Sequence, residues 1–103
     1  MYGMIIKINA KPGKGEELAS LMVRGAQRMP GCSHYIVSQE LNNPDSLWIT
    51  ELWESKERHD HSLSMHLVKD QIDAARPLIL GFENHVATRP IGGHGIELTH
   101  KEK

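Results

Sequence analysis

Two kinds of hydrophobic spacing divide the 103-residue chain into alternating strands and helices. Short segments rich in β-branched residues predict strands at residues 2–9, 32–41, 47–54 and 82–89. Hydrophobic residues at helical spacing predict a helix over 16–29 and a helical region over 56–76. In chain order, turns rich in glycine, proline and asparagine separate the segments 2–9, 16–29, 32–41 and 47–54. The predicted order is β-α-β-β-α-β, which is typical of an α+β, ferredoxin-like fold with a four-stranded antiparallel sheet.

The second helical region has clear ends in the sequence. Ser55 precedes the region and is well placed as its N-cap, and Pro77 ends it. A bend or break is expected near Ser64 and Met65. The region is therefore expected to form one bent helix or two helices in tandem.

A sheet with both helices on one face leaves its other face bare. That face is expected to carry large side chains, among them Trp48 or Trp53, Tyr35 and several aliphatic residues. An apolar surface of this size is unfavourable in water, and pairing two such sheets across a two-fold axis buries it. The sequence therefore predicts a homodimer.

Composition narrows the functional classes. The net charge is −1, and no clustered basic face is evident of the kind that nucleic acids and anionic membranes attract. No apolar run approaches the ~20 residues of a membrane helix, and no secretory leader is expected. Cys32 is the only cysteine, which excludes an internal disulfide and favours a reducing compartment. We expect a cytoplasmic protein with no nucleic acid or membrane partner, residues 1–91 forming one domain and 92–103 a glycine-rich tail.

The junction between the third strand and the second helix carries the most informative chemistry. Trp53 ends the strand and His59 lies at the start of the helix, so an aromatic wall and a titratable ring are close together. Histidine suits the role of a general base because its ordinary pKa is near neutral. The alternative for His59 is a solvent-facing surface residue.

His61 is expected on a different side of the same helix. At ~100° per residue it lies about 200° from His59, on the hydrophobic stripe of Val68 and Ile72, so it is expected to point inward or to the pocket edge. The same geometry prevents the two imidazoles from binding one ion, and His66 lies about two turns from His59. No metal site is therefore expected.

Several segments of the chain share their order and spacing with one known family. They are the opening strand followed by Lys11-Pro12-Gly13, then Met29-Pro30-Gly31-Cys32, Glu51-Leu52-Trp53-Glu54-Ser55, His59-Asp60-His61-Ser62-Leu63, Arg76-Pro77-Leu78-Ile79 and Ile91-Gly92-Gly93-His94-Gly95. Together they resemble the antibiotic biosynthesis monooxygenase (ABM) family of the dimeric α+β barrel superfamily, and the last three resemble its quinol monooxygenase subgroup. The resemblance implies a homodimeric enzyme that oxidises a small aromatic, quinol-like or polycyclic phenolic molecule with O2, without flavin, haem or metal.

The resemblance also implies site residues. Many family members carry a histidine nine residues after the position of Trp53, where this chain has Ser62. His61 and His66 keep the family's five-residue spacing one place early, and His59 is where the subgroup it resembles places its histidine. The catalytic candidates are therefore His59 and His61. The substrate-binding candidates are Trp53, Tyr35, Ser62 and His66, with core packing as the alternative for Tyr35.

Two other functions remain open. An isomerase of the same architecture would use a histidine as a proton shuttle and would need a polar, basic cavity, for which Arg76 and Arg89 are the candidate groups. A non-catalytic ligand-binding or stress-response protein would keep the pocket without the chemistry. Haem degradation is disfavoured, because no histidine lies clearly on the inner face of the second helical region.

Two further motifs carry no predicted chemistry. Cys32 and His34 lack a third group that would orient a base, so the cysteine is expected to be a packing residue. The segment 92–95 lacks the lysine and the context of a phosphate loop. It is expected to belong to a tail that reaches across the dimer and covers the partner's pocket.

Overall fold

The protein, described by a computed structural model over residues 1–27 and 29–96, forms one four-stranded antiparallel sheet with helices on one side. Residue 28, in the predicted first helix, and residues 97–103 of the predicted tail lie outside the described residues. This architecture confirms the α+β, ferredoxin-like prediction. The elements are β1 (Tyr2–Ala10), α1 (Gly15–Gly25), β2 (Cys32–Glu40), β3 (Asn43–Trp53), α2 (Lys56–Ser62), α3 (His66–Ala75), a 3-10 turn (Arg76–Leu78) and β4 (Ile79–Thr88).

The second helical region is two helices, and the predicted start and break are both confirmed. The side chain of Ser55 accepts a hydrogen bond from the backbone N–H of Arg58 at 3.1 Å, as an N-cap does. After α2 the backbone N–H groups of Leu63, Ser64 and Met65 each bond to the carbonyl three residues earlier. Met65 then becomes extended before α3 begins, so α2 and α3 have independent helical phases.

Three boundaries differ from those predicted. The helix predicted to reach residue 29 ends at Gly25. The turn predicted over 42–46 is much shorter, because β3 already begins at Asn43. Finally, β4 begins at Ile79, directly after the 3-10 turn that contains Pro77. Pro44 lies near the start of β3, where a missing N–H is tolerated because few ladder bonds are lost.

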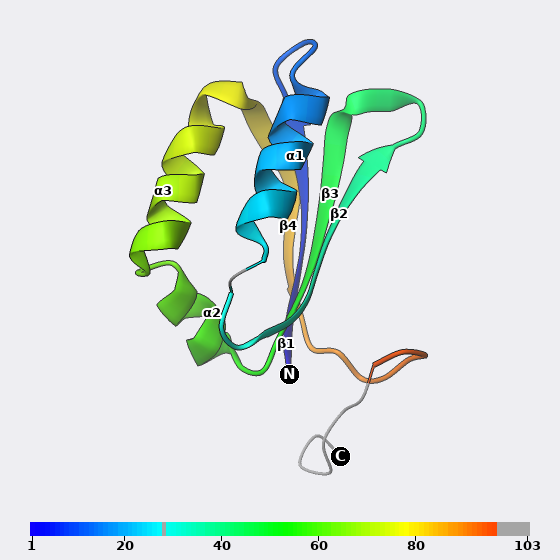
Figure 1. The fold of residues 1–103 in the computed structure, drawn as a ribbon. Coiled ribbons are helices and arrows are strands. Elements are labelled where there is room, and N and C mark those ends of the chain that lie inside the picture. The colour runs from blue at the N-terminus through cyan, green and yellow to red at the C-terminus, as the bar shows by residue number, and fades with distance from the viewer. Residues whose placement is uncertain (28, 97–103) are drawn as a thin grey trace.

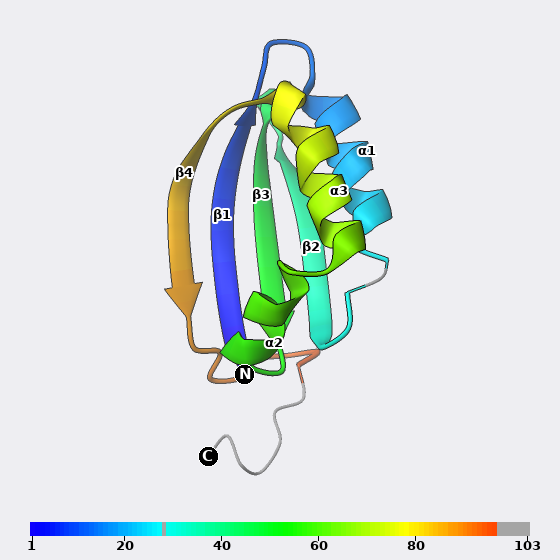
Figure 2. The same cartoon turned by 90° about the vertical axis from the view of Figure 1, so that its left-hand side faces the viewer.

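The strands are ordered β2-β3-β1-β4, and all three helices lie on one side of the sheet (Figure 1). In the second view, α1 and α3 lie over the β2 and β3 side, while β4 remains uncovered (Figure 2). The short helix α2 lies at the end of the sheet near the N-terminus (Figure 2). The helix layer therefore covers only part of the face on which it lies. No described helix has the length and apolar character needed to cross a membrane.

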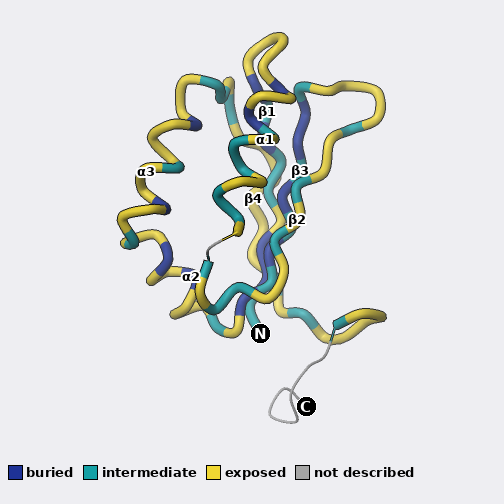
Figure 3. Tube along the Cα trace, viewed as in Figure 1, coloured by how far each residue is buried: buried dark blue, intermediate teal, exposed yellow. Residues whose placement is uncertain are grey.

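The packed core occupies the end of the sheet where β1 ends. Leu18 from α1 and Leu47 and Ile49 from β3 are completely buried, and Ile8 joins them from β1. Figure 3 shows the buried positions along the central strands and the inner sides of the helices. Burying each such side chain stabilises the fold by roughly 1.5–3 kcal/mol. Ile8 and Ala75 of this core also border the open space, which extends from here towards α2.

Hydrogen bonds connect the start of α1 to the β2–β3 hairpin. The backbone N–H groups of Gly13 and Gly15 donate to the carboxylate of Asp45 at 3.0 and 2.9 Å. A Cβ atom at Gly15 would lie 1.9 Å from the carbonyl oxygen of Pro44. Only glycine allows this close approach, which fixes α1 against the sheet.

A β-bulge interrupts the pairing of β4 with β1. Ile5 pairs with Val86 and Lys7 with Glu83, so Asn84 and His85 together oppose one residue of β1. Asn84 has a φ of 50°, a left-handed conformation that asparagine tolerates better than most residues. Strict alternation from Phe82 would put His85 on the open face. The bulge changes the phase and puts it on the helix-covered face.

Candidate functional site

A cavity of about 690 Å³ lies between the sheet and the helices of a single chain. Its size is within the usual range for small-molecule sites. Most of its lining is apolar, and a few polar groups are clustered among those side chains. The lining comprises Met4, Ile6, Ile8, Met22, Met29, Tyr35, Glu51, Trp53, His59, Ser62, Leu63, Val68, Gln71, Ile72, Ala75, Arg76, Ile79, Phe82 and His85.

The strand register arranges the cavity floor in rows that cross the sheet. From the α2 end, the cavity-lining members of successive rows are Trp53; then Tyr35, Glu51 and Met4; then Ile6; then Ile8 and Phe82. Adjacent rows are about 7 Å apart, because alternate residues of a strand face one side at ~3.4 Å rise per residue. Polar groups occupy the rows near α2, and hydrocarbon occupies the rows near the packed core. The floor of the cavity therefore has one polar end and one apolar end.

His59 projects from α2 at the polar end. It is only 9% exposed, and its ring lies between two aromatic rings. Its centroid is 5.4 Å from that of Trp53, edge-on at 81°, and 5.3 Å from that of Tyr2. These contacts fix the plane of the imidazole. The alternative of a solvent-facing His59 is therefore wrong.

Asp60 orients the imidazole of His59. Nδ1 of His59 lies 3.0 Å from Oδ1 of Asp60, and Nζ of Lys56 lies 2.7 Å from the other carboxylate oxygen. The hydrogen bond from Lys56, and then that from His59, hold the pKa of Asp60 below its usual value. An ionised Asp60 accepts a hydrogen bond from the Nδ1–H of His59, which leaves the Nε2 lone pair of His59 available as a base.

Glu51 is a buried carboxyl group in the cavity that the sequence analysis missed. It is 7% exposed and accepts a hydrogen bond from Nε1 of Trp53 at 2.9 Å. Burial raises its pKa, although the hydrogen bond from Trp53 and the charges of His59 and His85 oppose the shift. The sequence did hold a signal: Glu51 is two residues before Trp53 on a strand, so the two share a face.

Tyr35 and Ser62 both line the cavity, as expected for substrate-binding residues. Burial, and then the charge of Glu51, raise the pKa of Tyr35, so its hydroxyl stays protonated and can donate a hydrogen bond. The hydroxyl of Ser62 donates to the backbone carbonyl of His59 at 2.6 Å. Its oxygen can still accept a hydrogen bond from a ligand. Both hydroxyls are therefore available, one as donor and one as acceptor.

His85 is the second cavity residue that the sequence analysis missed. It lies in the bulge opposite Ile6, and its Nε2 is 3.1 Å from the sulfur of Met4, which itself pairs with Ala87. The bulge at Asn84 produces this placement. No local sequence signal for it was available, because the bulge depends on the pairing of β4 with β1.

The predicted inward position of His61 is wrong, and His66 does not line the cavity either. His61 is exposed and does not line the cavity, because α2 ends at Ser62 and does not continue the phase of α3. His66 is the first residue of α3, and its side chain is 90% exposed, 3.7 Å from Asp70. Neither ring reaches the space that a substrate would occupy.

The remaining candidates do not form a reactive centre. Burial and the charge of Glu51 raise the pKa of Cys32 to about 11, so its thiol is protonated at neutral pH and is a poor nucleophile. Nδ1 of His34 lies 3.2 Å from the hydroxyl oxygen of Ser33 rather than against the thiol of Cys32. Across residues 1–27 and 29–96 there is no group of three His, Cys, Asp or Glu side chains that could hold a metal ion.

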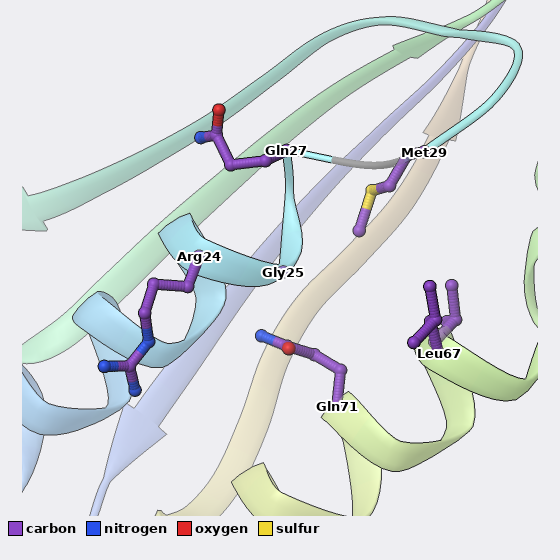
Figure 4. Close-up of a pocket in the computed structure, with 7 residues that line it drawn as sticks. Arg24, Gly25, Gln27, Met29, Leu67 and Gln71 are labelled. Carbon is purple, nitrogen blue, oxygen red and sulfur yellow. The ribbon is translucent and has the colours of Figure 1, made fainter.

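A smaller hollow of about 220 Å³ lies between the end of α1 and the start of α3 (Figure 4). It shares Met29, Val68 and Gln71 with the main cavity. Gln71 points from α3 towards α1 (Figure 4) and donates to the carbonyl of Leu21. A Cβ atom at Gly25 would lie 2.1 Å from the amide carbon of Gln71. Glycine at this position therefore allows Gln71 to connect the two helices along the cavity wall.

Comparison with known proteins supports the fold and shows the family. Residues 1–74 match the family profile described as Antibiotic biosynthesis monooxygenase. A Chloroflexus aurantiacus J-10-fl structure assigned by name to these monooxygenases is 48% identical, with a TM-score of 0.88 over 93% of this chain and 98% of that chain.

Two more distant structures show the fold alone. One is a Deinococcus radiodurans protein assigned by name in the same way, with 24% identity and a TM-score of 0.73 over 96% of this chain and 99% of that one. The other is SnoaB, a cofactor-independent oxygenase from Streptomyces nogalater, with 17% identity and a TM-score of 0.77 over 92% of this chain and 97% of that one. No curated protein sequence matches the chain.

Proposed function

The chain belongs to the antibiotic biosynthesis monooxygenase family, and we propose that it oxidises quinol-like or polycyclic phenolic compounds with O2 without a cofactor. One observation carries the proposal: a buried imidazole, His59, lines a largely apolar cavity and is oriented by Asp60. A phenolic substrate needs a base and an apolar enclosure, and the cavity supplies both. SnoaB, which shares the fold, is named as a cofactor-independent oxygenase, and we extend that property to this chain as part of the proposal.

The order of polar and apolar rows along the cavity floor favours an elongated aromatic substrate. Its oxygenated end would lie near His59, Glu51 and Tyr35, and its hydrocarbon rings would lie against Ile6 and Ile8. This arrangement leaves no buried charge against the apolar rings and gives each substrate hydroxyl a polar neighbour.

In the proposed reaction His59 starts electron transfer by removing a proton. Nε2 of His59 takes a proton from the phenol or from its keto tautomer, because the resulting anion is electron-rich enough to pass one electron to O2. The substrate radical and superoxide then combine with formation of a C–O bond. One oxygen atom of O2 remains in the product as a carbonyl, and the other leaves as water.

A homodimer is part of the proposal. The sheet face opposite the helices exposes apolar side chains, including Ile36 and Val86, each 49% exposed, and Ile5. Lys7 on the same face lies 3.2 Å from Glu40 and 3.8 Å from Glu83, so its charge is balanced within the chain. Pairing two such faces would bury the apolar surface. We also propose a cytoplasmic location, and that the tail after β4 covers the partner's cavity.

The alternative isomerase is less well supported. Arg76 lines the cavity edge, but its Nε lies 3.7 Å from Asp73 and both side chains are 74% exposed. Arg89 is exposed and does not line the cavity. A phosphorylated sugar would therefore meet a mostly apolar wall.

Oxygen uptake tests the proposal. The wild type and the His59→Ala and His61→Ala variants are mixed with menadiol and with an anthrone, and the rates are corrected for autoxidation. We expect the wild type to exceed the buffer rate, His59→Ala to lose at least about 100-fold, and His61→Ala to stay within about twofold, because a positioned base contributes 10²–10⁴-fold. A wild-type rate equal to buffer contradicts the oxygenase. Equal rates for wild type and His59→Ala contradict the assignment of His59 as the base.

A further inference from the structure

We infer that Glu51 is a second catalytic residue of this site, which removes the last carbon-bound proton of the oxygenated intermediate and returns it to the departing hydroxide. The inference rests on the proposed function and deepens it. It assigns the two proton transfers of the reaction to two different side chains, His59 on α2 and Glu51 on β3.

The carboxyl group of Glu51 is directed into the cavity. One oxygen accepts the indole N–H of Trp53 at 2.9 Å. Among residues 1–27 and 29–96, no other side-chain hydrogen bond to Glu51 is found, and no fully buried side-chain oxygen or nitrogen lacks a partner. The second oxygen of Glu51 is therefore not sealed in protein. It faces the space that Glu51 lines.

A structural role does not explain why this residue is a carboxylic acid. The indole of Trp53 needs an acceptor, but a neutral amide would accept the same hydrogen bond without the cost of burying a charge. Burial raises the pKa of Glu51, which brings proton exchange by the carboxyl group closer to neutral pH. A carboxyl group with such a pKa suits a residue that both takes and returns a proton.

Glu51 and His59 both contact Trp53, through different parts of the indole. The carboxyl group of Glu51 accepts the indole N–H at 2.9 Å, and the imidazole of His59 lies edge-on to the ring. The Cα atom of Glu51 is one row beyond that of Trp53, about 7 Å along the strand. Glu51 pairs with Met4, whose sulfur contacts the ring of His85 from the neighbouring row. One planar substrate bound along the strands could thus meet the imidazole at one atom and the carboxyl group at another.

The chemistry requires this second proton transfer. After the substrate anion and O2 have combined and the peroxide has taken up the proton held by His59, the oxygenated carbon still carries one hydrogen atom. The carboxylate of Glu51 takes this proton, the C–H electron pair forms the carbonyl, and the O–O bond breaks. The departing hydroxide takes the proton back from Glu51 and leaves as water. Substrate and O2 are converted to carbonyl product and water, and both side chains return to their starting states.

The test measures O2 uptake and product formation in the same reaction, with quenched samples assayed for hydroperoxide. The variants are Glu51→Gln and a matched control, Glu40→Gln. Glu40 also accepts an indole N–H, from Trp48 at 2.8 Å, but it does not line the cavity. For Glu51→Gln we expect O2 uptake within about threefold of wild type, product formation at least about tenfold slower, and accumulated hydroperoxide. For Glu40→Gln we expect uptake and product formation to remain matched.

The outcomes separate this inference from the proposed function. If the wild type takes up no O2, the proposed function fails and the inference fails with it. If the wild type is active and Glu51→Gln forms product in step with O2 uptake without hydroperoxide, at whatever rate, Glu51 has no separate second step and the inference is overturned. If Glu51→Gln folds poorly, a Glu51→Asp variant provides the test. This variant keeps a carboxyl group on a shorter side chain, so we expect slower product formation with partial hydroperoxide accumulation. Product formation that matches O2 uptake at the wild-type rate would overturn the inference.

Discussion

His59 and Asp60 are neighbours in sequence, and their side chains form a hydrogen-bonded pair, with Nδ1 and Oδ1 3.0 Å apart. The imidazole faces the cavity while the carboxylate is half exposed at the surface. A partner at one ring nitrogen determines which nitrogen carries the proton. The pair therefore connects the surface of α2 to the chemistry inside.

Replacing Asp60 tests whether this orientation matters. For Asp60→Asn we expect the turnover number to fall about tenfold with little change in KM, because the base alone contributes 10²–10⁴-fold and an amide no longer fixes which ring nitrogen carries the proton. Asp70→Asn is a matched control, since Asp70 lies 3.7 Å from the exposed His66. Steady-state oxygen uptake measures both variants. Equal losses in the two variants would contradict the role of Asp60.

The buried carboxyl group of Glu51 makes stability depend on pH. Its pKa is raised above the ordinary 4.5, so the folded state binds the proton more tightly than the unfolded state. Proton binding at Glu51 therefore stabilises the fold fully below pH 4.5, and this stabilisation is lost as pH rises through the folded-state pKa. We expect Glu51→Gln to have a higher Tm than wild type at pH 8, with the two converging towards pH 4. Glu40→Gln should behave oppositely, because the hydrogen bonds from Trp48 and Lys7 lower the pKa of Glu40. Thermal unfolding across pH measures both, and a Tm difference for Glu51→Gln that does not vary with pH would contradict the assignment.

The exposed sheet face predicts the oligomeric state. We expect wild type to sediment at twice the chain mass of 11.6 kDa, and Ile36→Glu to sediment as a single chain, because a charge at the centre of an apolar interface costs several kcal/mol. Val23→Glu changes an equally exposed position on α1 and should leave the dimer intact. A wild type that sediments as a single chain would contradict the proposed pairing.

The close approach at Gly15 predicts a large cost for one methyl group. A Cβ atom there would meet backbone atoms of Pro44, so we expect Gly15→Ala to lower the free energy of unfolding by about 1–3 kcal/mol. At Gly81 an added Cβ has no heavy atom within 4 Å, and Gly81→Ala should change stability by no more than about 0.5 kcal/mol. Urea denaturation compares the two variants, and equal effects would show that the helix start tolerates displacement.

The order of elements was predictable because each has a local signal. Ser55 caps α2 through the N–H of Arg58 three residues later, and the break near Met65 follows serines whose side chains bond to nearby backbone. Both features are determined within a few residues, so the sequence predicts them well.

The site was predictable only in part. The direction of the His61 side chain was predicted by continuing the hydrophobic stripe of α3 back into α2. The break between the two helices resets the helical phase, so that prediction failed. His85 reaches the cavity because β4 contains a bulge, which is a property of strand pairing and not of the strand alone. The position of Glu51 could have been predicted from the sequence, because it lies two residues before Trp53 on a strand and so shares its face. An acid at an inward strand position is itself a signal of function.

The central claim is that this cavity transfers one atom of O2 to an aromatic substrate. The most direct measurement is mass spectrometry of the product formed from an anthrone under ¹⁸O2, with the rate compared between wild type and His59→Ala. The account predicts one labelled oxygen atom per product molecule and label in the released water, formed by the wild type well above the rate of autoxidation and by His59→Ala at no more than that rate. Unlabelled product, or equal rates with and without the imidazole, would contradict it.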